Sequence, residues 1–90
     1  MDVKTIMVIG AGQMGNGIAQ VAAQAGYTTY MSDISQDLVD KGMASISKNL
    51  DRMVKKEKIT AGDKDQIVSR ITPVTDLEPA SQCDLTVEAV

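Results

Sequence analysis

Three glycines near the start of the chain have a spacing that suits phosphate binding. Gly10, Gly12 and Gly15 form the pattern Gly-x-Gly-x-x-Gly, in which the first permits a tight turn, the second lets a phosphate approach the backbone, and the third allows close packing of a helix. We expect the free backbone N–H groups of Gln13 and Met14, with the partial positive charge of a helix N-terminus, to face the phosphates. Because glycine is common in turns, the spacing alone does not separate a binding loop from a structural one.

The sequence on both sides of the glycines supplies the missing context. Residues 5–9 are a β-branched, nearly all-apolar run, which predicts a strand buried on both faces of a parallel sheet. Small and apolar residues then recur at helical spacing on one face, up to a C-cap predicted at Gly26. The residues of this face are Gly15, Ile18, Ala19, Ala22 and Ala25. The glycines therefore connect a buried strand to a helix that can pack closely on a sheet.

An acidic residue stands where a dinucleotide-binding fold needs one. Residues 27–32 predict a second strand, and Asp33 follows it, 18 residues after Gly15, near the usual interval of about 20. Its carboxylate is expected to accept both ribose hydroxyls, and it would repel a 2′-phosphate. The next three residues supply no arginine to bind such a phosphate, so NAD is favoured over NADP. FAD binds the same fingerprint, and the loop alone leaves a flavoprotein open.

The rest of the chain continues the alternation of helices and strands. Residues 35–56 have the apolar spacing of a long amphipathic helix with Ser35 as N-cap, and Thr60 to Asp63 resembles a capping box that begins a shorter helix. Residues 71–74 predict a short strand, which Pro73 places at a sheet edge or a strand start. A helical turn over 76–82 and a strand over 84–90 follow. The predicted fold class is α/β: residues 1–90 form an incomplete, Rossmann-type doubly wound parallel sheet, the first part of an NAD-binding domain.

Composition and charge narrow the class of protein. Ninety residues, 43% hydrophobic and 23% charged, are those of one folded domain at most. The net charge of −3 gives no reason to expect nucleic acid as a partner. No apolar stretch approaches the roughly 20 residues that cross a bilayer, so no membrane partner is expected, and no metal site is predicted. The single cysteine, Cys83, excludes an internal disulfide, which with no signal peptide favours the cytoplasm.

Beyond spacing, residues 9–20 resemble the start of the 3-hydroxyacyl-CoA dehydrogenase family, in particular its short bacterial branch that acts on 3-hydroxybutyryl-CoA. The likeness extends along the whole chain, which argues against flavoproteins and against 6-phosphogluconate-type dehydrogenases, where a basic residue usually follows the second strand. Further similar segments are Asp33-Ile34, Lys48-Asn49-Leu50, Lys55-Lys56, Ser69-Arg70-Ile71 and residues 83–90.

The resemblance implies an enzyme of fatty acid and butyrate metabolism that interconverts a 3-hydroxyacyl-CoA and a 3-ketoacyl-CoA by hydride transfer with NAD. In that family a histidine acts as acid and base, a glutamate orients it, and a serine and an asparagine assist; all match positions beyond this chain, which contains no histidine. We therefore expect no catalytic residue here, and a structural or cofactor-proximal role for Glu88. The resemblance also implies a homo-oligomer formed through a C-terminal helical domain outside this chain. The alternative is a stand-alone NAD-sensing module without catalysis.

One face of the long predicted helix is polar. Ser45, Asn49, Arg52 and Lys56 follow one another at intervals of four, three and four residues, and so share a face. From spacing alone, a solvated surface is the simpler interpretation. By resemblance, Asn49 and Lys56 match positions that contact coenzyme A, whose phosphates suit a lysine as a point charge.

Overall fold

The fold is a four-stranded parallel sheet with the strand order β3-β2-β1-β4, seen in a computed structural model that describes residues 3–89. The strands are β1 (Thr5–Ile9), β2 (Thr28–Ser32), β3 (Ile71–Val74) and β4 (Leu85–Glu88). The helices are α1 (Gln13–Gln24), α2 (Gln36–Lys55), α3 (Ala61–Ser69) and the short 3₁₀ helix η1 (Glu78–Gln82). The alternation predicted from the sequence is confirmed.

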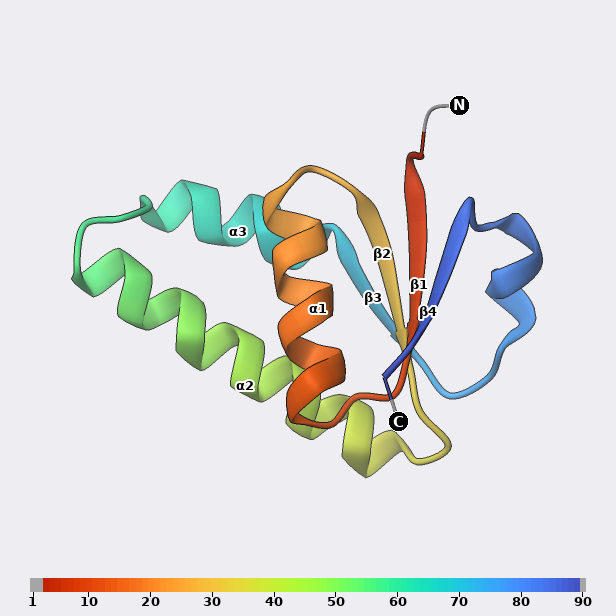
Figure 1. The fold of residues 1–90 in the computed structure, drawn as a ribbon. Coiled ribbons are helices and arrows are strands. Elements are labelled where there is room, and N and C mark those ends of the chain that lie inside the picture. The colour runs from red at the N-terminus through yellow and green to blue at the C-terminus, as the bar shows by residue number, and fades with distance from the viewer. Residues whose placement is uncertain (1–2, 90) are drawn as a thin grey trace.

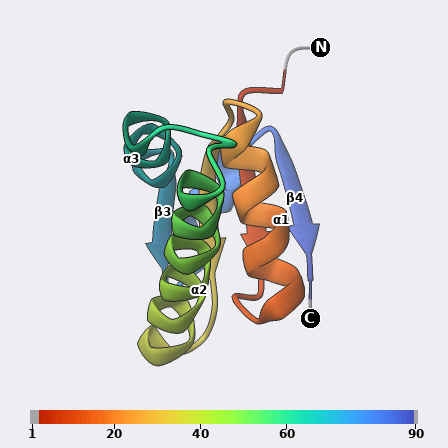
Figure 2. The ribbon, with the colours of Figure 1, turned by 90° about the vertical axis from the view of Figure 1, so that its left-hand side faces the viewer.

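All three α-helices lie on one face of the sheet (Figure 1), because each right-handed crossover from β1 to β2 and from β2 to β3 moves in the same direction along the sheet. The connection from β3 to β4 returns across the sheet and places η1 on the opposite face. Figure 2, turned towards the helices, shows α1 between α2 and β4. The direction of winding therefore reverses between β1 and β4, and ligands of open α/β sheets bind beside such a switch point, at the carboxyl ends of the strands.

The core explains why β1 consists of apolar residues. Ile6 and Val8 belong to the cluster beneath the helices, whereas Met7 points to the other face, and Met7 and Val8 are fully buried. The prediction of a strand buried on both faces is confirmed. The helices complete the cluster with fully buried Ile46 and Leu50 of α2, which are spaced four residues apart on one side of that helix.

The helix ends follow the predicted signals closely. Gly26 has a φ of 100° just after the C-cap residue Ala25, so a left-handed glycine ends α1. Ala25 itself is exposed, although the apolar spacing had placed it on the buried face. The capping box that begins α3 is confirmed: the Thr60 hydroxyl accepts from the Asp63 N–H and the Asp63 carboxylate from the Thr60 N–H, both at 3.0 Å.

The two edges of the sheet are β3 and β4. Pro73 lies in β3, so its missing N–H removes no bond from the sheet centre, as its sequence position predicted. The strand predicted over 84–90 is observed from Leu85 to Glu88, and Val90 lies outside the described residues. β4 pairs with β1 along its whole length, bringing Glu88 into register with Ile9, beside the glycine loop.

Candidate functional site

The glycine loop leaves β1 at its carboxyl end and turns directly into α1. Gly10 has a φ of 111°, a left-handed conformation that favours glycine, and its N–H donates to the carbonyl oxygen of Ser32 at 2.7 Å. A Cβ on Gly15 would lie 1.7 Å from the Gly10 carbonyl oxygen. The third glycine of the pattern is therefore needed for close contact between α1 and the backbone that leaves β1.

Gly12 is the open position of the loop. It is the extended N-cap residue of α1, no side chain caps the helix there, and a Cβ on Gly12 would have no atom within 4 Å. The N–H groups of the first helical turn, which start at Gln13 and Met14, have no intrahelical partner by geometry. An anion placed over Gly12 would meet these donors and the positive end of the helix dipole.

Asp33 ties the glycine loop to the end of β2. One oxygen of its half-buried carboxylate accepts from the Ala11 N–H at 2.9 Å, and the other accepts from the Ile34 N–H at 2.7 Å. Asp33 and Gly10 also line a cavity of about 220 Å³ at the carboxyl ends of the strands. Each carboxylate oxygen can accept more than one hydrogen bond, so Asp33 holds the loop and still has acceptor capacity for a ligand in this cavity.

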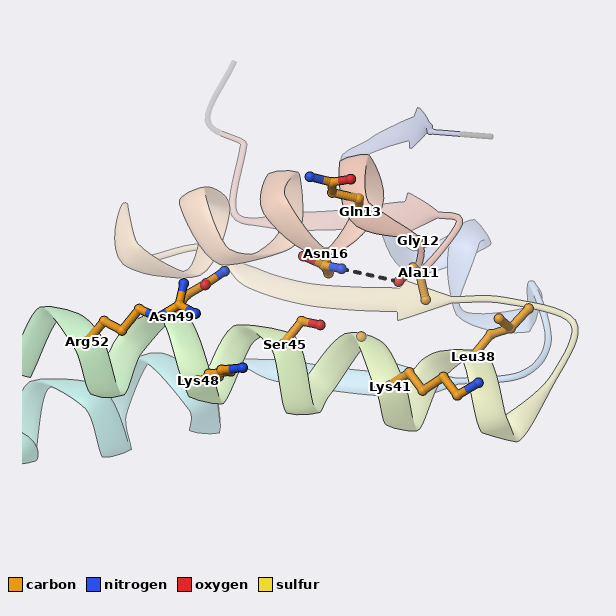
Figure 3. A pocket seen from close by; sticks show the side chains of 11 residues that line it. Ala11, Gly12, Gln13, Asn16, Leu38, Lys41, Ser45, Lys48, Asn49 and Arg52 are labelled. Atoms are coloured by element: carbon orange, nitrogen blue, oxygen red, sulfur yellow. Dashed lines mark hydrogen bonds between the residues drawn. The ribbon is translucent and has the colours of Figure 1, made fainter.

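A second cleft, of about 530 Å³, runs between the start of α1 and one face of α2. Lys41, Lys48 and Arg52 line it from α2, and Gly12 and Asn16 line it from the other side (Figure 3). The Asn16 amide donates to the Ala11 carbonyl oxygen at 3.5 Å, which connects the cleft wall to the glycine loop. Among residues 3–89, no acidic residue lines the cleft. Its charge therefore suits an anionic ligand.

The structure separates the residues predicted on the polar face of α2. Ser45, Asn49 and Arg52 line the cleft together, as their shared helix face predicts. Lys56, in contrast, is the exposed C-cap residue of α2 and is not among the residues that line the cleft. Asn49 is half-buried and donates to the Gln20 carbonyl oxygen of α1 at 3.3 Å.

The side chains of Gln13 and Met14 lie on a different surface from the backbone N–H groups that we expect to bind phosphate. Their side chains are exposed, and both line an apolar groove between α1 and β4. The Met14 side chain is 67% exposed there. Of these two residues, only Gln13 also lines the cleft between α1 and α2, called the cationic cleft below because Lys41, Lys48 and Arg52 line it. Met14 would therefore contact a phosphate through its backbone N–H and not through its side chain.

Comparison with known proteins decides the family. Residues 5–90 match the family described as "3-hydroxyacyl-CoA dehydrogenase, NAD binding domain". The chain belongs to this family. The predicted family and fold are therefore confirmed, and the glycine loop with Asp33 lies in a domain of known NAD-binding type.

Relatives of this NAD-binding domain include enzymes named for two acyl groups. A 3-hydroxybutyryl-CoA dehydrogenase from Bradyrhizobium diazoefficiens is 46% identical over 86 residues, covering 96% of this chain and 29% of the relative. A 3-hydroxyadipyl-CoA dehydrogenase from Escherichia coli is 37% identical over 89 residues, covering 99% of this chain and 19% of the relative. The crystal structure of an (S)-3-hydroxybutyryl-CoA dehydrogenase from Ralstonia eutropha superimposes with a TM-score of 0.96 at 42% identity, over 99% of this chain and 31% of that chain. The chain thus spans less than a third of each of these relatives.

The sequence pattern did not predict that Gly42 helps to shape the site. Gly42 lies inside α2, and a Cβ there would lie 2.9 Å from both the Ala11 carbonyl oxygen and the Met31 methyl carbon. Gly42 therefore lets α2 approach the glycine loop closely enough to form the cleft. The available signal was the glycine itself, because glycine inside a helix costs about 1 kcal/mol relative to alanine. Lys41 and Lys48 were also missed as cleft residues, since helical spacing alone does not show which turn of α2 faces α1.

Asp84 and Cys83, whose pKa values are shifted, lie at the amino ends of the strands, away from the glycine loop. The Asp84 carboxylate accepts from the backbone N–H groups of Lys4 at 2.8 Å and Thr5 at 3.1 Å, and these two bonds lower its pKa. Burial, followed by the negative charge of Asp84, raises the pKa of the Cys83 thiol. Cys83 is half-buried, two residues before β4 begins.

Other site classes find no support within residues 3–89. This part of the chain contains no group of three or more histidine, cysteine, aspartate or glutamate residues arranged to hold a metal ion. None of its helices is long and apolar enough to span a membrane.

Proposed function

We propose that the protein to which this chain belongs interconverts a 3-hydroxyacyl-CoA, with 3-hydroxybutyryl-CoA as the expected substrate, and the corresponding 3-ketoacyl-CoA by hydride transfer with NAD. The names of the relatives support the reaction and the substrate class. The observation that carries the role of this chain is the placement of Asp33: its carboxylate lies at the end of β2 and is bonded to the glycine loop through Ala11.

The loop geometry fits the adenosine and pyrophosphate parts of NAD. Open space above Gly12 allows a phosphate to reach the first N–H groups of α1. The remaining acceptor capacity of Asp33 suits the two ribose hydroxyls, and its negative charge disfavours the 2′-phosphate of NADP. When bound, NAD would supply the hydride acceptor for oxidation of the substrate alcohol. The residues of this chain would bind and orient that acceptor.

The acid–base group of the reaction is assigned to the rest of the protein. This chain has no histidine, the side chain whose ordinary pKa best suits proton transfer near neutral pH. Glu88 is exposed and in register with Ile9 at the end of β4, which suits a position near the cofactor. A C-terminal helical domain would supply the catalytic groups and the homo-oligomer contact, and the proposed location is the cytoplasm.

Coenzyme A is proposed to lie along α2. Asn49 lines the cleft with Lys48 and Arg52. The phosphates of coenzyme A would contact the two cationic side chains, and its amide groups would contact the neutral Asn49. Lys56 lies one turn beyond Arg52 and would contact the coenzyme where it leaves the cleft. This arrangement gives the substrate a binding site that is remote from the reacting carbon.

The decisive experiment measures NAD and NADP binding, together with turnover of acetoacetyl-CoA and NADH, in the complete protein and in Asp33→Asn. The asparagine keeps one oxygen that can accept from the Ala11 N–H, but it loses the charge. Because a hydrogen bond to a charged group contributes about 1.5–3 kcal/mol, NAD affinity should fall by about tenfold or more. NADP affinity should fall less or rise, so the preference for NAD should shrink.

Two results would contradict this proposal in different ways. An unchanged ratio of NAD to NADP affinity would remove Asp33 from ribose recognition. NAD binding by the complete protein without turnover of any 3-hydroxyacyl-CoA or 3-ketoacyl-CoA would favour the NAD-sensing module instead.

A further inference from the structure

A chain of side-chain hydrogen bonds crosses the interface between α1 and α2. The Asn49 amide nitrogen donates to the Gln20 carbonyl oxygen at 3.3 Å, and the Gln20 amide nitrogen donates to the Gln24 carbonyl oxygen at 3.2 Å. The amide nitrogens of Gln20 and Gln24 also face the Met53 sulfur, at 3.9 and 3.8 Å. All of these bonds are partly buried, and they connect the cleft residue Asn49 to side chains outside the cleft.

The Met53 sulfur gives this chain a direction. A thioether can accept a hydrogen bond but cannot donate one, so both glutamines turn their NH₂ groups towards Met53. The Gln20 carbonyl oxygen is then directed towards Asn49 and can be satisfied only by a donor. Asn49 must therefore present its NH₂ group to Gln20, which leaves the Asn49 carbonyl oxygen for another partner.

The remaining oxygen of the Asn49 amide can only accept hydrogen bonds, unlike the side chains on either side of it. Lys48 and Arg52 line the same cleft and can only donate hydrogen bonds. Their positive charges suit phosphate groups, whereas the Asn49 oxygen suits an N–H donor. Coenzyme A carries both kinds of group, since it has phosphates, two amide N–H groups in its pantetheine arm, and an amino group on adenine.

We propose that Gln20 is a positioning residue for substrate binding: it holds the Asn49 amide so that its oxygen, rather than its NH₂ group, faces an N–H group of coenzyme A. This inference rests on the proposed coenzyme A contact of Asn49. The two ends of an asparagine amide have nearly the same shape, so without Gln20 the amide would rotate and present a donor to a donor for part of the time. Gln20 acts through Asn49 and does not itself line the cleft.

The test compares two thioesters in the complete enzyme. Acetoacetyl-CoA carries the whole coenzyme, whereas the S-methyl thioester of acetoacetate keeps the reacting group and lacks every phosphate and every N–H group of the coenzyme. Gln20→Leu should raise KM for acetoacetyl-CoA by about three- to tenfold, the range expected for one neutral hydrogen bond, with kcat unchanged. KM and kcat for the short thioester should not change.

Two further variants separate positioning from packing. Gln20→Glu keeps an oxygen that accepts from Asn49, so KM for acetoacetyl-CoA should return to within about twofold of the wild type. Gln24→Leu removes an amide from the same interface but leaves the bond between Gln20 and Asn49 intact, so it should also leave KM near the wild-type value. An equal increase in KM for Gln24→Leu and Gln20→Leu, or an increase for both thioesters, would overturn the positioning role.

Asn49→Ala distinguishes failure of this inference from failure of the proposed function. If Asn49→Ala leaves KM for acetoacetyl-CoA unchanged, Asn49 does not contact the coenzyme, and the proposed contact fails. If Asn49→Ala raises KM but Gln20→Leu does not, the contact stands and the positioning role is wrong. In the double variant, Gln20→Leu should add nothing to Asn49→Ala, because Gln20 acts only through that residue.

Discussion

The contact between Gly15 and Gly10 leads to a sharp prediction for Gly15→Ala. The added Cβ would lie 1.7 Å from the Gly10 carbonyl oxygen and 2.6 Å from its carbonyl carbon. Both atoms belong to the backbone, and the Gly10 N–H is bonded to Ser32 at 2.7 Å, so no flexible side chain can move aside. The loop or the start of α1 must shift by more than an ångström. Overpacking of this kind costs about 1–3 kcal/mol, and the shift displaces the N–H groups proposed to bind the pyrophosphate.

Gly17→Ala is the matched control for Gly15→Ala. Gly17 lies two residues further along the same helix, and a Cβ there would have no atom within 4 Å. Because alanine favours a helix interior over glycine by about 0.5–1 kcal/mol, Gly17→Ala should stabilise the domain by about that amount. Gly15→Ala should instead lower the free energy of unfolding by about 1–3 kcal/mol, and its NAD affinity should fall at least tenfold.

Urea unfolding and NAD titration of both variants, in the complete protein, measure these differences. If Gly15→Ala were as stable as Gly17→Ala and bound NAD as the wild type does, the close packing between α1 and the glycine loop would not exist. The start of α1 would then lack the geometry that an anion site requires.

Two further predictions concern Lys56 and Asp84. Lys56→Ala should raise KM for acetoacetyl-CoA several-fold and leave kcat unchanged, because a contact remote from the reacting carbon contributes uniform binding; an unchanged KM would return Lys56 to the solvated surface. The bonds from Lys4 and Thr5 lower the folded-state pKa of Asp84, so the stabilisation they provide is present above the unfolded pKa of about 3.9 and is lost as the pH falls through the lowered folded-state pKa. Wild type should therefore be more stable than Asp84→Asn at neutral pH, and the difference should shrink below about pH 4; a difference in unfolding free energy that is constant with pH would contradict this explanation.

The strands, helices and glycine loop could be predicted because local rules determine them. The apolar run of β1, the left-handed Gly10 and Gly26, and the capping box at Thr60 are each encoded within a few residues. The bond from the Ala11 N–H to Asp33 could not be predicted, because it joins residues 22 apart in sequence and depends on how β1 and β2 pair.

The cationic cleft shows the limit of helical spacing. Spacing places Asn49 and Lys56 on one side of α2, but seven residues of helix separate them by about 10 Å along the axis. Which turn faces α1 depends on where the two helices cross, and Gly42 determines that by allowing α2 to approach Ala11. Lys41 and Lys48 consequently line the cleft while Lys56 does not. A glycine inside an otherwise amphipathic helix was the only local sign of this crossing.

The two roles of Asp33 also affect how its variants should be interpreted. Its carboxylate accepts from the Ala11 N–H and is proposed to accept from ribose, so Asp33→Ala would remove a loop contact and a ligand contact together. The fall in NAD affinity after Asp33→Ala would then exceed the contribution of the ribose bonds alone. Asp33→Asn retains an acceptor for Ala11, and its effect on NAD relative to NADP is the better measure of ribose recognition. If Asp33→Ala lowers the affinity for both NAD and NADP much further than Asp33→Asn does, the additional loss of affinity measures how strongly Asp33 holds the glycine loop in its binding conformation.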